Sequence, residues 1–195
     1  FIDQVGVPGA TSVTLDRRKA MAEVTSHLLA LGHRSFGLLG ISGTARSAID
    51  RLQGIEAALA EANLRIAEAT RSLDHLYPRD NDFEYGRQLA TRFAQLKDRP
   101  SAFLALNDAI AIGAMHTFQG LGLAVPAQVS ITGFNNQDIC EMTTPGLTSV
   151  DQEVDATVRT ATDLLLSRVG KPASARAVVR TIPPRLVIRG STGPV

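Results

Sequence analysis

The sequence predicts an α/β protein with a mostly parallel, doubly wound sheet and helices on both faces. Short apolar runs of strand length alternate with longer segments in which apolar residues recur every three or four positions. Glycine or a capping residue stands at the ends of most of the longer segments. With 195 residues, 44% of them hydrophobic, the chain can bury a core in one α/β domain or in two small lobes.

The first helix is expected to begin after Asp16, whose side chain can cap it, and to end at Gly32. Its apolar residues have helical spacing: Met21, Val24, Leu28 and Leu31. A buried strand is expected over 36–40, and a polar turn over 43–47 then leads into a second helix. One face of that second helix is apolar: Ile49, Leu52, Ile55, Leu59 and Ala62.

A third helix is expected after Asp80–Asp82, a stretch that supplies capping oxygens and negative charge at a helix N-terminus. Its inward face consists of Gly86, Leu89, Phe93 and Leu96. The pattern then predicts a strand over 102–107, a helix over 108–121 that stops at Gly122, and a strand over 129–134.

The last part of the chain predicts a short strand over 147–150 and a final helix. That helix is marked by Val154, Val158, Ala161 and Leu165. Two closing strands, 177–182 and 185–189, flank the pair Pro183–Pro184. Repeated strand–helix units are joined by right-handed crossovers, and such sheets bind ligands beyond the carboxyl ends of their strands.

Composition excludes several classes of function. There are 20 basic and 19 acidic residues, and no Lys/Arg cluster exceeds the three in 16–19, so nothing resembles a nucleic-acid footprint. Apolar runs are interrupted well before bilayer length and no signal segment opens the chain, so we expect no membrane partner. The single cysteine, Cys140, excludes an internal disulfide and a cysteine-based zinc site, and is compatible with the cytoplasm.

Motifs for catalysis and cofactors are not found. Glycines 37, 40 and 43 are spaced G-x-x-G-x-x-G, and Gly37 falls inside a predicted strand, so a dinucleotide loop would lack its tight turn. There is no Gly-x-Ser-x-Gly elbow and no P-loop, and the four histidines have no metal-ligand spacing. We therefore expect no enzyme activity, no metal and no cofactor, although an α/β enzyme stays a third possibility.

The pair Asn107–Asp108 raises a sharper question, because it places two polar residues at the junction of a buried strand and a helix. Ligands are expected at that edge of the sheet. Asp is also a preferred helix cap, and Asn tolerates turn geometry. Both interpretations, a ligand contact and a strand-to-helix turn, stay open from these residues alone.

A series of motifs in order along the chain resembles the lactose-repressor family of bacterial transcription regulators. It comprises Leu-Gly-His-Arg at 31–34, Arg-Leu-Gln-Gly at 51–54, Asn-Asp to Gly at 107–113, Val-Pro to Gly-Phe at 125–134, Pro-Gly-Leu-Thr-Ser-Val at 145–150 and Ile-Arg-Gly-Ser-Thr at 188–192. Spread over most of the chain, the series is far more specific than any member alone.

The resemblance implies a helix-turn-helix followed by a two-lobed, periplasmic-binding-protein-like effector domain, with a small molecule held between the lobes. The chain has no initiator Met and is expected to begin inside a larger protein, late in an incomplete first lobe. Residues 16–149 and 183–195 would form the C-terminal lobe, and 1–15 and 150–182 part of the N-terminal lobe. The implied assembly is a homodimer that binds operator DNA only through the absent helix-turn-helix. A periplasmic sugar-binding protein of a transporter is the alternative.

The resemblance also points to candidate ligand residues. Asp3 ends the first expected strand, where related proteins place a carboxylate; otherwise it is an exposed acid. Arg51 matches a family arginine whose rigid fork suits ligand oxygens, and its alternative is a solvated helix residue. Ser47, four residues earlier on the same helical face, could add a hydroxyl or cap the helix. Asn107 belongs to the pair discussed above.

Two further candidates lie later in the chain. Asn135 departs from the family, in which many members carry Asp at this strand end, and its amide both donates and accepts hydrogen bonds. This favours an effector that offers an acceptor as well as a donor, sugar-like or nucleoside-like. Gln152 matches a family glutamine near the crossing between lobes, where it would contact ligand or brace the hinge.

Overall fold

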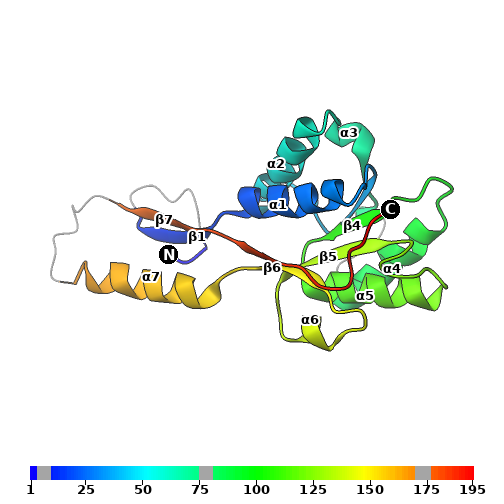
Figure 1. The fold of residues 1–195 in the computed structure, drawn as a ribbon. Coiled ribbons are helices and arrows are strands. Elements are labelled where there is room, and N and C mark those ends of the chain that lie inside the picture. The colour runs from blue at the N-terminus through cyan, green and yellow to red at the C-terminus, as the bar shows by residue number, and fades with distance from the viewer. Residues whose placement is uncertain (4–9, 75–80, 170–176) are drawn as a thin grey trace.

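A computed structural model describes residues 1–3, 10–74, 81–169 and 177–195. Its strands form a six-stranded sheet in the order β3-β2-β4-β5-β6-β8 and a two-stranded sheet, β1-β7 (Figure 1). The strands are β1 (Ser12–Leu15), β2 (Phe36–Leu39), β3 (Thr70–Ser72), β4 (Ala102–Ala105), β5 (Ser130–Asn135), β6 (Thr148–Asp151), β7 (Val179–Ile182) and β8 (Arg185–Val187). The helices are α1 (Arg17–Ala30), α2 (Arg46–Glu61), α3 (Ile66–Ala69), α4 (Asp82–Ala94), α5 (Asp108–Gly120), α6 (Ile139–Met142) and α7 (Val154–Leu166).

The predicted fold class is confirmed. Neighbouring strands of the large sheet are parallel except for β6 and β8, which are antiparallel. The pattern did not predict β1, β3, α3 or α6, because these elements are three or four residues long and β3 has no buried residue. The last strand is shorter than the expected 185–189.

Helices cover both faces of the large sheet, with α1 and α2 on one side and α4 and α5 on the other (Figure 1). Each face has its own hydrophobic core. On the α4/α5 side, the Phe103 ring lies 5.1 Å from that of Phe93 and 4.8 Å from that of Phe118, measured between centroids. Aromatic pairs at such separations add to the stabilisation from burial.

Each helix pair crosses at glycine. A Cβ placed on Gly54 of α2 would lie 2.1 Å from the Arg18 carbonyl oxygen of α1. In the other pair, a Cβ on Gly86 would lie 2.1 Å from the Ile110 carbonyl oxygen, and one on Gly113 would lie 2.0 Å from that of Phe83. Only residues without a side chain allow backbones to approach this closely.

The ends of the helices follow the sequence signals. Asp16 Oδ1 accepts from the Lys19 amide at 2.9 Å, and Asn81 Oδ1 accepts from the Glu84 amide at 3.0 Å, so both caps are formed. Asp80, part of the expected capping stretch, lies outside the described residues. Gly32 has a φ of 98°, which is the left-handed conformation expected of a helix stop.

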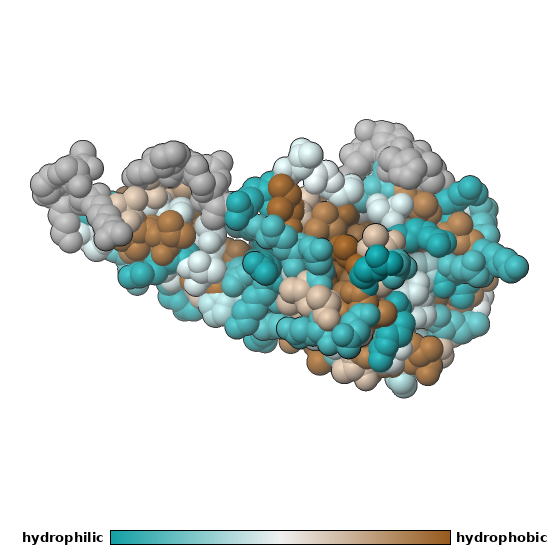
Figure 2. Space-filling view, turned by 90° about the horizontal axis from the view of Figure 1, so that it is seen from above, coloured by the Kyte–Doolittle hydropathy of each residue, from teal (hydrophilic) through white to brown (hydrophobic). Residues whose placement is uncertain are grey.

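The small sheet and α7 form the narrow end of the molecule (Figure 1). No residue of α7 is buried, and its apolar side chains, including Val158 and Leu165, are exposed. Figure 2 shows hydrophobic residues gathered at this end, and a hollow of about 300 Å³ lies between β1 and α7. Among the described residues, no helix is long and apolar enough to cross a membrane.

Candidate functional site at the carboxyl edge of the sheet

The strand order of the large sheet reverses between β2 and β4. The chain passes from β2 outward to β3 and then returns to place β4 on the other side of β2. In open α/β sheets, ligands bind at the carboxyl ends of the strands that flank such a reversal. Here those ends meet at Gly40 and Leu106, where the Leu106 amide donates to the Leu39 carbonyl at 2.9 Å.

Asn107 lies at this reversal and is the cap of α5. Its Oδ1 accepts from the Ile110 amide at 2.9 Å, and its Nδ2 donates to Asp82 Oδ2 at 2.6 Å. The capping interpretation of the Asn-Asp pair is therefore correct for Asn107. The same side chain also joins the N-termini of α4 and α5, since Asp82 is the first residue of α4.

Arg51 is buried rather than solvated, with 7% of its surface exposed. Its guanidinium carbon lies 4.5 Å from the centroid of the Phe134 ring, and its Nη1 donates to the Ser47 carbonyl at 3.1 Å. A cation over an aromatic face is attracted by the ring quadrupole. The interpretation of Arg51 as a surface residue is wrong, because Phe134 of β5 holds it against the sheet.

Ser47 and Asp3 are both exposed. The N-cap of α2 is Ala45, without a side-chain cap, so Ser47 does not cap the helix, and its carbonyl accepts from Arg51 Nη1. Asp3 forms an ion pair with Arg17 and has a φ of 60°. It follows an isolated bridge between Ile2 and Val13 and lies beside β1 of the small sheet, where its amide donates to the Val13 carbonyl at 2.7 Å.

Asn135 and Gln152 contact each other. Gln152 Nε2 donates to Asn135 Oδ1, so the end of β5 is tied to the segment that leaves β6. Asn135 has a φ of 120°, a backbone conformation that residues with a side chain rarely adopt. The structure therefore brings together the two late candidates and leaves the Asn135 amide nitrogen as the group able to donate.

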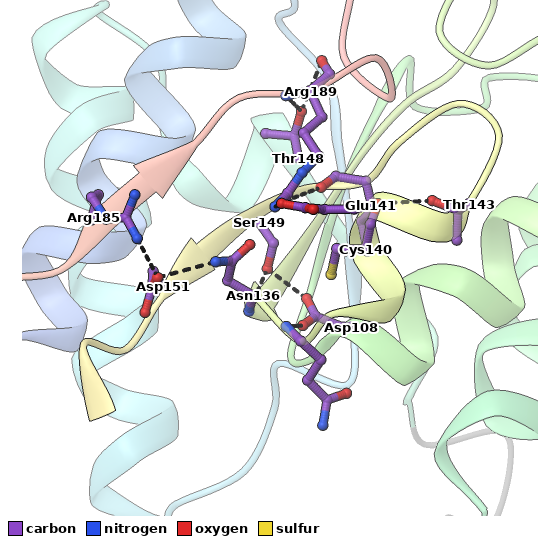
Figure 3. Close-up of polar contacts among 12 residues, drawn as sticks. Asp108, Asn136, Cys140, Glu141, Thr143, Thr148, Ser149, Asp151, Arg185 and Arg189 are labelled. Atoms are coloured by element: carbon purple, nitrogen blue, oxygen red, sulfur yellow. Dashed lines mark hydrogen bonds and ion pairs between the residues drawn. The ribbon is translucent and has the colours of Figure 1, made fainter. Parts of the chain in front are cut away.

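Asp108 plays a role that the sequence did not reveal. It is fully buried, its Oδ1 accepts from Ser149 Oγ at 2.5 Å, and its Oδ2 accepts from the Gln137 amide at 2.9 Å (Figure 3). Burial raises the pKa of the Asp108 carboxyl, and burial together with Asp108 raises that of the Cys140 thiol to about 12. Cys140 is thus protonated and unreactive, and Asp108 fixes the loop after β5.

A second polar group continues this network toward the crossing between the two sheets (Figure 3). Asn136 Nδ2 donates to Asp151 Oδ2 at 3.0 Å, and its amide donates to Ser149 Oγ. Arg185 of β8 donates to Asp151 at 2.6 Å and to Glu153 at 2.8 Å. The segment that leaves the large sheet after β6 is therefore joined to β8, where the chain returns to that sheet, and to the loop beside Asn135.

The histidine of the 31–34 motif is structural. His33 is buried, its Nδ1 lies 2.8 Å from Ser101 Oγ, and its Nε2 lies 3.0 Å from Ser130 Oγ and 3.1 Å from the Gly193 carbonyl. It ties the amino ends of β4 and β5 to the C-terminal segment. No group of His, Cys, Asp or Glu residues able to hold a metal occurs within the described ranges.

Comparison with known proteins matches the chain to one family model. That model, the periplasmic binding protein-like domain, covers residues 25–192. A curated relative, the HTH-type transcriptional repressor PurR of Photobacterium profundum, is 31% identical over 169 residues, which is 86% of this chain and 48% of that protein. The HTH-type transcriptional regulator DegA of Bacillus subtilis is 30% identical over 187 residues, 94% of this chain and 52% of that protein. The chain spans about half the length of these relatives.

Solved structures give the same answer. A LacI family transcriptional regulator from Enterococcus faecium with bound ribose superposes with a TM-score of 0.87 at 25% identity, covering 100% of this chain and 71% of that one. A putative LacI family regulator from Sanguibacter keddieii also has a TM-score of 0.87, at 29% identity, covering 98% of this chain and 72% of that one.

Proposed function

The chain belongs to the periplasmic binding protein-like domain family, and from that membership we propose that it is the effector-sensing and dimerising core of a bacterial, LacI-type DNA-binding regulator. Relatives named as HTH-type regulators support this function over a sugar-binding protein of a transporter. The proposal assigns the chain no catalytic step and no cofactor, and places it in the cytoplasm with its operator. Operator binding is assigned to a helix-turn-helix outside these 195 residues.

The proposed lobes follow the two sheets. Residues 16–149 with 183–195 make the C-terminal lobe, and 1–15 with 150–182 make part of the N-terminal lobe. The small sheet has only two strands among the described residues, and the apolar side chains of α7 are exposed beside it. An exposed apolar face of this kind supports an incomplete lobe.

The observation that carries the proposal is the set of polar side chains at one edge of the sheet, around the reversal of strand order. Arg51 over Phe134, Asn107 after β4, and Asn135 with Gln152 come from successive elements at that edge. Asp3 and Ser47 are retained as proposed contacts from outside that group. The guanidinium of Arg51, with its several N–H donors, and the neutral amides beside it suit a polar ligand with several hydroxyl groups.

The proposed effector is therefore sugar-like or nucleoside-like. Asn135 Oδ1 already accepts from Gln152, and its Nδ2 is the group able to donate, which fits a hydroxyl oxygen better than a fixed positive charge. The Enterococcus faecium regulator, described with bound ribose, and an Escherichia coli regulator described as sugar-binding support this class of ligand. Ribose is accordingly the first probe.

The test is calorimetric titration of the full-length regulator with ribose, other pentoses, hexoses and nucleosides. Arg51→Lys keeps the charge and much of the stem but removes the planar fork. It is expected to weaken binding of the ligand found by about 1.5–3 kcal/mol, the scale for a hydrogen bond to a charged group. Arg46→Lys is the matched control, since Arg46 lies on the same helix, exposed, and pairs with Asp50.

An unchanged affinity in Arg51→Lys would remove Arg51 from the site. Failure of every sugar and nucleoside to bind the wild-type protein would overturn the effector class. Binding that survives Arg51→Lys but is lost in Arg46→Lys would place the ligand elsewhere on α2.

The homodimer is proposed through the faces of the molecule that carry α5 and α6. Ile139 and Met142 of α6 are 48% and 77% exposed, and Phe83 stands beside His116 of α5 with ring centroids 6.3 Å apart. Exposed apolar side chains on neighbouring elements are typical of protein interfaces. A two-fold pair suits a regulator that reads two half-sites.

A further inference from the structure

Asp74 follows β3 at the carboxyl edge of the sheet, and one strand, β2, separates it from Asn107, which follows β4. Strands β2 and β3 are parallel with Leu38 opposite Ser72, so Asp74 comes level with the end of β2. Its Oδ1 accepts from the Gly40 amide at 2.8 Å. Gly40 in turn flanks the reversal of strand order, where a Cβ on it would touch Leu106 and Ile110.

The position of Asp74 is fixed from two further sides. Its amide donates to Ser72 Oγ at 3.3 Å, and the hydroxyl of Tyr85, a buried residue of α4, donates to its carbonyl at 3.1 Å. Because the contacts from β3 and α4 hold the main chain of Asp74 and the Gly40 amide holds Oδ1, the carboxylate has little freedom to turn elsewhere. Rigid placement of this kind is what a binding group requires.

The second carboxylate oxygen, Oδ2, is buried and has no hydrogen-bond partner within the described part of the chain. Asp108, on the same edge of the sheet, differs because both of its oxygens accept hydrogen bonds. Leaving a buried acceptor unpaired is unfavourable, and native structures do so rarely. Both oxygens of Asp108 therefore serve the fold, whereas Asp74 has one oxygen that can still accept a hydrogen bond from a ligand.

We propose that Asp74 is a further specificity-determining residue, whose Oδ2 accepts a hydrogen bond from a hydroxyl or N–H group of the bound effector. This rests on the proposed effector-sensing function and adds to it a requirement for a donor at one position of the ligand. An ionised carboxylate accepts only, so it rejects a ligand that lacks the donor or presents an acceptor there.

The test combines one protein variant with changes in the ligand. The full-length protein is titrated with ribose and with its singly deoxygenated analogues, as wild type and as Asp74→Asn. Asparagine can keep the contact with the Gly40 amide through its oxygen while placing an NH₂ group where Oδ2 stands. Asp98→Asn is the control, because Asp98 is an exposed acid whose carbonyl accepts from Arg71 Nη1.

Wild type is expected to bind one deoxy analogue at least about 10-fold more weakly than ribose, the scale for a hydrogen bond to a charged group. Asp74→Asn should weaken the binding of ribose by a similar factor and should bind that analogue as tightly as wild type does. The loss of affinity from the variant and the loss from the deoxy analogue should therefore not add. Its unliganded melting temperature should be unchanged or higher, because a buried charge has been removed.

Several results overturn the proposal. Equal affinity of the wild-type protein for ribose and for every deoxy analogue would overturn it, even before a variant is made. Equal affinity of Asp74→Asn and wild type for ribose would also overturn it, and so would additive losses of affinity from the variant and the deoxy analogue. Neither of these two results would affect the proposed effector-sensing function. Wild type that binds no sugar or nucleoside would overturn the sensing function itself, and this proposal with it.

Discussion

The crossing of α4 and α5 gives the sharpest test of how the site is built. Replacing Gly113 by Ala would place a Cβ 2.0 Å from the Phe83 carbonyl oxygen. Carbon and oxygen approach to about 3.3 Å at the closest, so the helices would have to separate by on the order of 1 Å. The obstructing atom is backbone and cannot rotate away.

The expected loss of stability follows from two opposing effects. Overpacking of a tight interior costs about 3 kcal/mol at the upper end of its usual range. Alanine recovers about 1 kcal/mol over glycine in a helix. The net loss is therefore about 2 kcal/mol, or about 4–8 °C in melting temperature for a protein of this size.

Urea-induced unfolding of this chain measures the change, with Gly120→Ala as control on the same helix. A Cβ on Gly120 would meet nothing within 4 Å. That variant should be as stable as wild type or up to about 1 kcal/mol more stable. A Gly113→Ala variant as stable as Gly120→Ala would refute the reasoning. Separation of the helices should also weaken ligand binding, because Asn107 and Asp82 join their N-termini.

Two other outcomes can be measured on the same material. Burial lowers the pKa of His33, and also that of His27, so the unfolded chain takes up protons first as the pH falls. The stability that the two neutral histidines contribute is present above the ordinary histidine pKa of about 6.5 and is lost below it. The urea concentration at the midpoint of unfolding should therefore fall from pH 7 to pH 5, and it should fall less in His33→Asn than in wild type. Met142→Glu should shift the dimer toward monomer in sedimentation at micromolar concentration, because a charge would enter the proposed apolar contact; an unchanged association constant would exclude α6 from the interface.

Periodicity in the sequence predicted the long elements well, because their signals are local. The apolar spacing of 21–31 and of 49–62 marked α1 and α2, and Asp16 and Gly32 marked both ends of α1. The same reasoning missed β3, since Thr70–Ser72 has no apolar pattern and exists through its pairing with Phe36–Leu38. Short elements made by tertiary pairing leave little local signal.

Arg51 shows a second limit of sequence reasoning. Its place near the start of α2 suggested a choice between ligand contact and solvated surface, and neither interpretation placed the guanidinium over an aromatic ring. The structure buries it over Phe134, a residue more than 80 positions further along the chain. Contacts of that separation depend on the strand order, which the apolar pattern does not encode.

What distinguishes ligand residues from structural ones at this edge is the state of each polar atom. Asn, Asp and Arg all belong there by residue type, because ligands bind at the carboxyl ends of the strands. Asp108 has both oxygens paired, and Asn107 uses its oxygen for α5 and its nitrogen for Asp82. Asp74 has one paired oxygen and one buried oxygen without a donor. An oxygen that the fold leaves without a donor is the one most available to a ligand, so Asp74 Oδ2 carries more information about the effector than the Asn107 amide, whose oxygen and nitrogen each already have a partner within the fold.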